Sequence, residues 1–91
     1  MSMLSLGETQ ELMKGLDDWS LEGMSMIKMI SFGDFRQALE FANKVGEIAI
    51  ELNHYPDIII SYNIVKLTLS SPSENAITEK DFEVAKKIDK L

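Results

Sequence analysis

His54 is the residue of this sequence best suited to acid–base chemistry. It is the only histidine in the chain. An imidazole has an ordinary pKa of about 6.5 and can therefore give or take a proton near neutral pH. His54 stands in the run Asn53-His54-Tyr55-Pro56-Asp57, where Pro56 forbids the continuation of a helix. A side chain at such a corner can face a cleft, although a lone histidine is more commonly a surface or capping residue.

Three further side chains have chemistry that would suit a flat heterocyclic ligand. Trp19 is the only tryptophan and could stack on such a ring, although packing in a small core is the commoner role. Tyr55 can donate a hydrogen bond, but a phenol with a pKa of about 10 is a poor base. Asp81 could orient an amino group, or it could serve the dipole of a helix that begins just before it.

The composition excludes several classes of site and partner. The chain has no cysteine, which excludes disulfides, thiol catalysis and thiolate metal sites, and a single histidine excludes a pair of histidine ligands. The net charge of −6 argues against nucleic acid and against an anionic membrane surface. The sequence shows no apolar run of about 20 residues and no signal peptide. We therefore expect a cytoplasmic protein without metal or cofactor.

The hydrophobic pattern predicts alternating helices and paired strands within one domain over residues 1–91. The expected elements are a helix from about Gly7 to Leu16, strands Trp19–Glu22 and Met24–Phe32, a helix Asp34–Leu52, strands Asp57–Tyr62 and Ile64–Ser70, and a third helix capped by Thr78. Short connections favour antiparallel strands, and the helices would cover one face of the sheet. This predicts an α+β, two-layer fold.

The long helix is the clearest of these elements. Its apolar residues recur in steps of three or four and should face the sheet: Phe35, Ala38, Ala42, Val45 and Ala49. Asp34 supplies the N-cap side chain, and Asn53 stands where such helices often stop. A chain of this size has a small core, and association with further copies would bury more apolar surface.

A set of residues spread along the chain matches the pattern of one known family: Phe32-Gly33-Asp34-Phe35, Ala38, Phe41, Val45, Ala49, Asn53-His54-Tyr55-Pro56, Tyr62, Val65, Thr68-Leu69, Ile77-Thr78, Asp81, Ala85 and Ile88-Asp89. From about residue 19 to residue 90 the sequence resembles the pterin-4a-carbinolamine dehydratases. The resemblance implies a four-stranded antiparallel sheet with three helices on one face. It also implies homodimers or homotetramers. The implied reaction is dehydration of a 4a-hydroxytetrahydropterin to a quinonoid dihydropterin in tetrahydrobiopterin recycling.

The resemblance also assigns a site. It makes His54 the principal acid–base group and Asp81 a second catalytic residue, with Trp19, Tyr55 and Pro56 binding the pterin substrate.

Four positions depart from the family pattern. The second histidine of the family falls on Tyr55, the third on Pro72, the glutamate on Ile50 and an aromatic residue on Ile58. One acid–base group typically contributes roughly 10²–10⁴ in rate, so we expect weakened activity.

Two alternatives stay open at this stage. The chain could be a non-catalytic family member that serves as a pterin-binding or protein-dimerisation module, or the fold could act on a different small molecule. A site filled by the side chains of Tyr55, Ile50 and Ile58 would favour the non-catalytic alternative.

Overall fold

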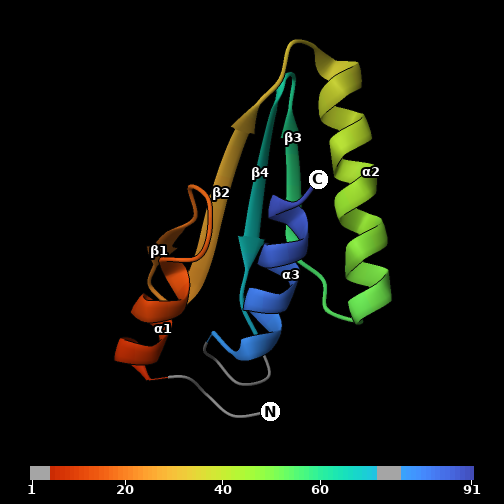
Figure 1. The fold of residues 1–91 in the computed structure, drawn as a ribbon. Coiled ribbons are helices and arrows are strands. Elements are labelled where there is room, and N and C mark those ends of the chain that lie inside the picture. The colour runs from red at the N-terminus through yellow and green to blue at the C-terminus, as the bar shows by residue number, and fades with distance from the viewer. Residues whose placement is uncertain (1–4, 72–76) are drawn as a thin grey trace.

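The computed structural model describes residues 5–71 and 77–91 and contains the predicted order of elements (Figure 1). These are α1 (Leu6–Met13), β1 (Ser20–Glu22), β2 (Ser25–Ser31), α2 (Phe35–Leu52), β3 (Asp57–Ser61), β4 (Ile64–Leu69) and α3 (Glu79–Asp89). The first helix ends at Met13, earlier than predicted, because a turn at Lys14 and Gly15 interrupts it. Pro72 lies outside the described residues.

The four strands form one antiparallel sheet in the order β1-β2-β4-β3. Strand β4 lies between β2 and β3, with Val65 opposite both Ile30 and Ile60. Burial alternates along β4, so that Val65, Leu67 and Leu69 are fully buried. These side chains define the face that the helices cover. The fold is therefore the predicted α+β arrangement of a four-stranded antiparallel sheet and three helices.

Helix α2 begins and ends as the sequence predicts. The side chain of Asp34 accepts a hydrogen bond from the backbone N–H of Gln37 at 2.9 Å, and Asn53 closes the helix in the left-handed conformation, with φ 54°. Ala38, Ala42, Val45 and Ala49 are buried as predicted. Across the described residues, no helix combines the length and the hydrophobicity needed to cross a membrane.

Phe35 does not belong to the buried face, although the periodicity placed it there. Its exposed fraction is 48%. Figure 1 shows that α3 ends well short of the first turn of α2, where Phe35 lies. The first turn therefore has the correct rotation to face the core but lacks a neighbouring helix to cover it.

Asp89 connects the end of α3 to β2 and to the segment just before β1. Its Oδ1 accepts hydrogen bonds from Trp19 Nε1 at 2.9 Å and from Lys28 Nζ at 2.8 Å, and its Oδ2 accepts one from the backbone N–H of Asp17 at 2.9 Å. The Lys28 ammonium also lies 5.8 Å from the centre of the Trp19 ring. Burial raises the pKa of Asp89, but these three hydrogen bonds and the charge of Lys28 outweigh it and hold the pKa below its usual range.

The lowered pKa of Asp89 predicts a loss of stability in acid. A carboxyl group with a depressed folded-state pKa contributes stability that is present above its unfolded-state pKa of about 3.9 and is lost as the pH falls through the folded-state value. We expect Asp89→Asn to be less stable near neutrality and to show a flatter decline of the free energy of unfolding below about pH 4. Urea unfolding at a series of pH values from neutrality to below about pH 4 measures the free energy of unfolding. Asp18→Asn, at an exposed position, is the control. Equal pH slopes for wild type and Asp89→Asn would contradict this prediction.

The two phenylalanines Phe82 and Phe35 should differ strongly in their contribution to stability. Phe82 is buried, with 3% of its surface exposed, whereas Phe35 is half exposed. Replacing a buried phenylalanine with alanine costs about 3–5 kcal/mol, which we expect for Phe82→Ala in urea unfolding. Because Phe35 stays in contact with water, Phe35→Ala should cost about 1 kcal/mol. Equal losses in the two variants would show that the first turn of α2 is covered after all.

Candidate functional site

The position of His54 is fixed by the sharp corner between α2 and β3. Asn53 turns the chain out of the helix through its left-handed conformation. The backbone N–H of His54 then bonds to the carbonyl oxygen of Ala49 at 3.1 Å. Pro56 follows immediately before the first residue of β3. The corner is therefore held by backbone geometry on both sides of His54.

The imidazole of His54 is paired with the carboxylate of Asp81. His54 Nε2 lies 2.5 Å from Asp81 Oδ1. The side chain of Asp81 has no exposed surface, and that of His54 retains 14%. The two residues are 27 positions apart in the sequence and come together because the first turn of α3 packs beside the α2–β3 corner. Two predicted catalytic residues are thus in direct contact.

The second carboxylate oxygen of Asp81 has two further hydrogen-bond donors. Asp81 Oδ2 accepts hydrogen bonds from the backbone N–H of Thr78 at 2.9 Å and from Ser71 Oγ at 3.0 Å. Ser71 Oγ in turn lies 2.9 Å from Thr78 Oγ1. Thr78 and Asp81 also form the capping box at the start of α3, as the sequence predicted for Thr78. A carboxylate can be buried here because both of its oxygens have partners.

His54 is the partly exposed member of this pair. Asp81 has no exposed surface, and both of its oxygens have protein partners. A carboxylate behind an imidazole fixes the ring and stabilises its protonated form. The geometry is therefore that of a general acid–base group with a carboxylate that positions it.

The other residues around His54 at which the sequence matches or departs from the family pattern differ in how far they are exposed. Tyr55 has 64% of its surface exposed, and its hydroxyl donates to Asn53 Oδ1 at 3.0 Å. Ile50 is 67% exposed, whereas Pro56 and Ile58 are partly buried. Neither Tyr55 nor Ile50 is packed into the interior of the chain.

Trp19 lies away from His54. The indole is buried and bonded to Asp89, while His54 is bonded to Asp81. Asp81 and Asp89 are eight residues apart on α3, or about 12 Å along the helix axis. Helix α3 thus holds Trp19 near one end and His54 near the other.

Ser71, which sequence reasoning missed, belongs to the network around Asp81. The signal for it was present in the alternation of β4, where Val65, Leu67 and Leu69 face the core. The same parity places Ser71 on the core side just past the strand, and Ser71 is buried in the structure. The contact between Asp89 and Lys28 had no comparable signal, because it joins positions 61 residues apart.

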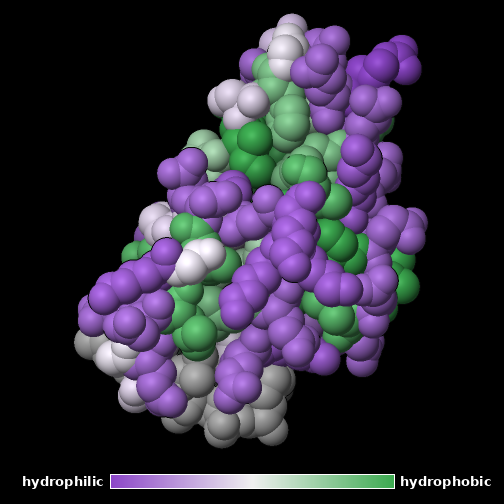
Figure 2. All heavy atoms as spheres, in the orientation of Figure 1, coloured by the Kyte–Doolittle hydropathy of each residue, from purple (hydrophilic) through white to green (hydrophobic). Residues whose placement is uncertain are grey.

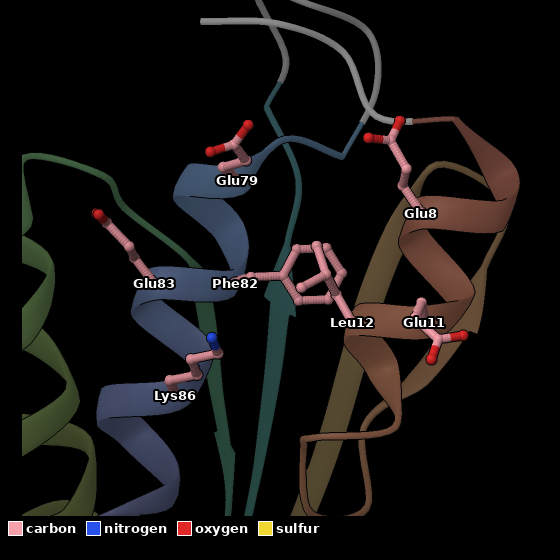
Figure 3. Close-up of a pocket in the computed structure, with 7 residues that line it drawn as sticks. All are labelled: Glu8, Glu11, Leu12, Glu79, Phe82, Glu83 and Lys86. Carbon is pink, nitrogen blue, oxygen red and sulfur yellow. The ribbon is translucent and has the colours of Figure 1, made fainter.

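Among the described residues, hollows also lie away from His54, and two of them are larger than the rest of those described. One, of about 450 Å³, lies between α1 and α3, where Leu12 and Phe82 point toward each other with acidic side chains around them (Figure 3). The other, of about 780 Å³, is lined by residues that include Lys28, Phe41 and Asp89. Neither lining includes His54 or Asp81.

Comparison with known proteins places the whole chain in one family. A family model described as pterin 4 alpha carbinolamine dehydratase matches residues 2–91. A Sulfolobus acidocaldarius protein named as a pterin-4-alpha-carbinolamine dehydratase is 41% identical over 88 residues, which cover 97% of each chain. A protein of the same name from Nostoc punctiforme is 42% identical over 89 residues, covering 98% of this chain and 96% of its own.

Solved structures agree with this result. A transcriptional coactivator/pterin dehydratase from Brucella melitensis superimposes with a TM-score of 0.92 at 32% identity and covers 98% of this chain and 97% of its own. A pterin dehydratase-like protein identified as a RuBisCO assembly factor superimposes with a TM-score of 0.64 at 19% identity, a similarity that concerns the fold alone. From the family match along nearly its full length and from these relatives, the chain belongs to the pterin-4-alpha-carbinolamine dehydratase family.

Proposed function

We propose that this protein catalyses the loss of water from a 4a-hydroxytetrahydropterin to give a quinonoid dihydropterin. The observation that carries the proposal is the imidazole of His54, which is partly exposed and is held by the buried carboxylate of Asp81 at 2.5 Å. Membership of the family supports the choice of a pterin as substrate. His54 is the acid–base group, and Asp81 positions it.

The reaction requires one base and one acid on the same substrate. A ring N–H loses its proton, the neighbouring C–O bond breaks, and the departing hydroxyl takes up a proton to leave as water, while a C=N bond forms. The lone pair of His54 accepts the ring proton, and the resulting imidazolium delivers a proton to the hydroxyl group. The negative charge of Asp81 stabilises the imidazolium between these steps.

The neighbourhood of His54 favours an enzyme of reduced activity over a non-catalytic module. The non-catalytic alternative would be supported by Tyr55, Ile50 and Ile58 filling the site. Tyr55 and Ile50 are largely exposed, and Ile58 packs against the core. Tyr55 stands where the family has its second histidine, so the site lacks one proton-transfer group. Such a group contributes roughly 10²–10⁴ in rate. We place the pterin beside His54, Tyr55 and Pro56, and we assign Trp19 to the support of α3 because its N–H is bonded to Asp89.

The rate of dehydration should depend on His54. In stopped-flow measurements on synthetic 4a-hydroxytetrahydropterin, His54→Ala should lose most of the acceleration over the uncatalysed reaction, because no second imidazole can replace it. Tyr55→Phe is the matched control and should keep most of the activity, since the exposed phenol is a poor base at neutral pH. Tyr55→His should raise the rate. An acceleration that survives in His54→Ala would contradict the assignment.

We further propose that the chain associates into a homodimer or homotetramer. Strands β1 and β3 are the two edges of the sheet, and unpaired edges favour pairing with another copy. Exposed apolar side chains lie on β3 and along one side of α2: Ile59, Phe35, Leu39 and Ile50. Leu39 and Ile50 are 11 residues apart and lie on one stripe of the helix, and Phe35 lies where this stripe borders the buried face.

Light scattering should therefore give a mass of at least twice the 10.3 kDa of one chain at micromolar concentration. A charge on the exposed stripe of α2 should lower this mass, so we expect Leu39→Glu to dissociate at higher concentration than the wild type. Lys44→Gln, which changes an exposed residue of the same helix, serves as the control. A monomeric wild-type protein would rule out the assembly.

A further inference from the structure

We infer that Ser71 positions the catalytic imidazole through Asp81, and that Nδ1 of His54 is the nitrogen that exchanges protons with the substrate. The first half concerns the geometry of the protein alone. The second half rests on the proposed dehydratase function. Both halves follow from the direction in which each hydrogen bond around Asp81 donates.

The donors around Asp81 can be ordered because Ser71 has a single hydroxyl proton. Ser71 Oγ donates that proton to Asp81 Oδ2 at 3.0 Å. In its contact with Thr78 Oγ1 at 2.9 Å, Ser71 must therefore be the acceptor, and the Thr78 hydroxyl must be the donor. The chain of donation runs from Thr78 through Ser71 to the carboxylate. The backbone N–H of Thr78 adds a second donor to the same oxygen.

These bonds determine which nitrogen of His54 carries the proton. Oδ2 of Asp81 already accepts two hydrogen bonds and therefore carries no proton. We infer that Oδ1 is an acceptor as well, and that Nε2–H of His54 is the donor in the contact of 2.5 Å between them. In neutral His54 the remaining nitrogen, Nδ1, is therefore the one with a free lone pair.

The same nitrogen is the one that reaches the surface. Within residues 5–71 and 77–91, every buried side-chain nitrogen or oxygen has a hydrogen-bond partner. The partner of His54 is Asp81, and it contacts Nε2. Nδ1, which makes no hydrogen bond among the described residues, therefore keeps some exposed surface, while Nε2 faces a carboxylate with no exposed area.

Ser71 matters because it limits how the carboxylate can turn. With Ser71 and the Thr78 N–H both bonded to Oδ2, rotation of the carboxylate would break two hydrogen bonds in a buried place. Without the hydroxyl, only the backbone N–H would hold that oxygen, and Oδ1 would be less firmly directed at His54. An orienting group behind a base commonly governs its tautomer and direction.

Nuclear magnetic resonance can read the tautomer directly, since the full chain contains one imidazole. With ¹⁵N-labelled histidine at about pH 8.5, two units above the ordinary imidazole pKa, we expect a downfield Nε2–H proton that is protected from exchange and an unprotonated Nδ1. A proton on Nδ1, or an Nε2–H that exchanges too fast to be detected, would overturn the inference. This readout does not depend on activity.

Variants of Ser71 test the positioning role. Ser71→Ala should lose the protected Nε2–H signal, and Ser71→Thr, which keeps a hydroxyl, should retain it. Ser70→Ala is the matched control on the adjacent residue and should resemble the wild type. If Ser71→Ala does not fold, Ser71→Cys replaces it, because a thiol is a weak donor and should weaken the signal. An unchanged spectrum in Ser71→Ala, or in its Cys replacement, would overturn the role of Ser71.

The dehydration rate separates this inference from the proposed function. Ser71→Ala should lower kcat about tenfold with little effect on KM, and Ser71→Thr should restore it. A loss of rate without a change in the His54 spectrum would contradict positioning through Asp81. If the wild-type protein does not accelerate dehydration, the proposed function fails, while the spectrum still decides between the tautomers.

Discussion

The carboxylate of Asp81 has no exposed surface, and a charge in that position is tolerated only if its oxygens are bonded. An unpaired buried carboxylate would cost several kcal/mol, so the surrounding chain has to deliver donors to it. The donors come from three places: the end of β4 through Ser71, the start of α3 through Thr78, and the α2–β3 corner through His54. The need to satisfy one buried charge therefore fixes how three segments meet.

A second carboxylate holds the other end of the same helix. Asp89 accepts hydrogen bonds from the side chains of Trp19 and Lys28 and from the backbone N–H of Asp17. These bonds connect α3 to the first half of the sheet. Between these two anchors α3 buries Phe82, Val84, Ala85 and Ile88 against the core. The apolar side chains supply most of the buried area, and the two carboxylates set where along the sheet the helix lies. Figure 2 shows that hydrophilic side chains cover much of the molecule in this view, with hydrophobic side chains visible between them.

Much of this fold could be predicted from the sequence, because periodicity reports which side of an element is buried. The alternation of β4 and the steps of three and four along α2 were sufficient for both elements. Phe35 shows the limit: its rotation on α2 was predicted correctly, but its burial depends on how far α3 extends. His54 and Asp81 were singled out by their residue types and given catalytic roles through the resemblance to the family, whereas their contact is a product of packing between distant segments.

The roles of particular side chains were harder to predict than their positions. Trp19 was expected beside the pterin. Its hydrogen bond to Asp89 could not be predicted, because no local pattern indicates a partner 70 residues away. Ser71 was overlooked because a serine after a strand usually belongs to a loop. In both cases the role of the side chain depends on a contact that forms only in the folded chain. The substitutions at Tyr55 and Ile50 leave His54 and Asp81 as the pair on which the proposed chemistry depends.

The most direct test of this account is a crystal structure of the protein with a stable dihydropterin bound. We predict that the ring lies beside the α2–β3 corner, with a ring nitrogen or the 4a position within about 3 Å of His54 Nδ1, while Asp81 still holds Nε2. A pterin bound at the α1–α3 hollow or beside Trp19, with His54 uninvolved, would contradict the account.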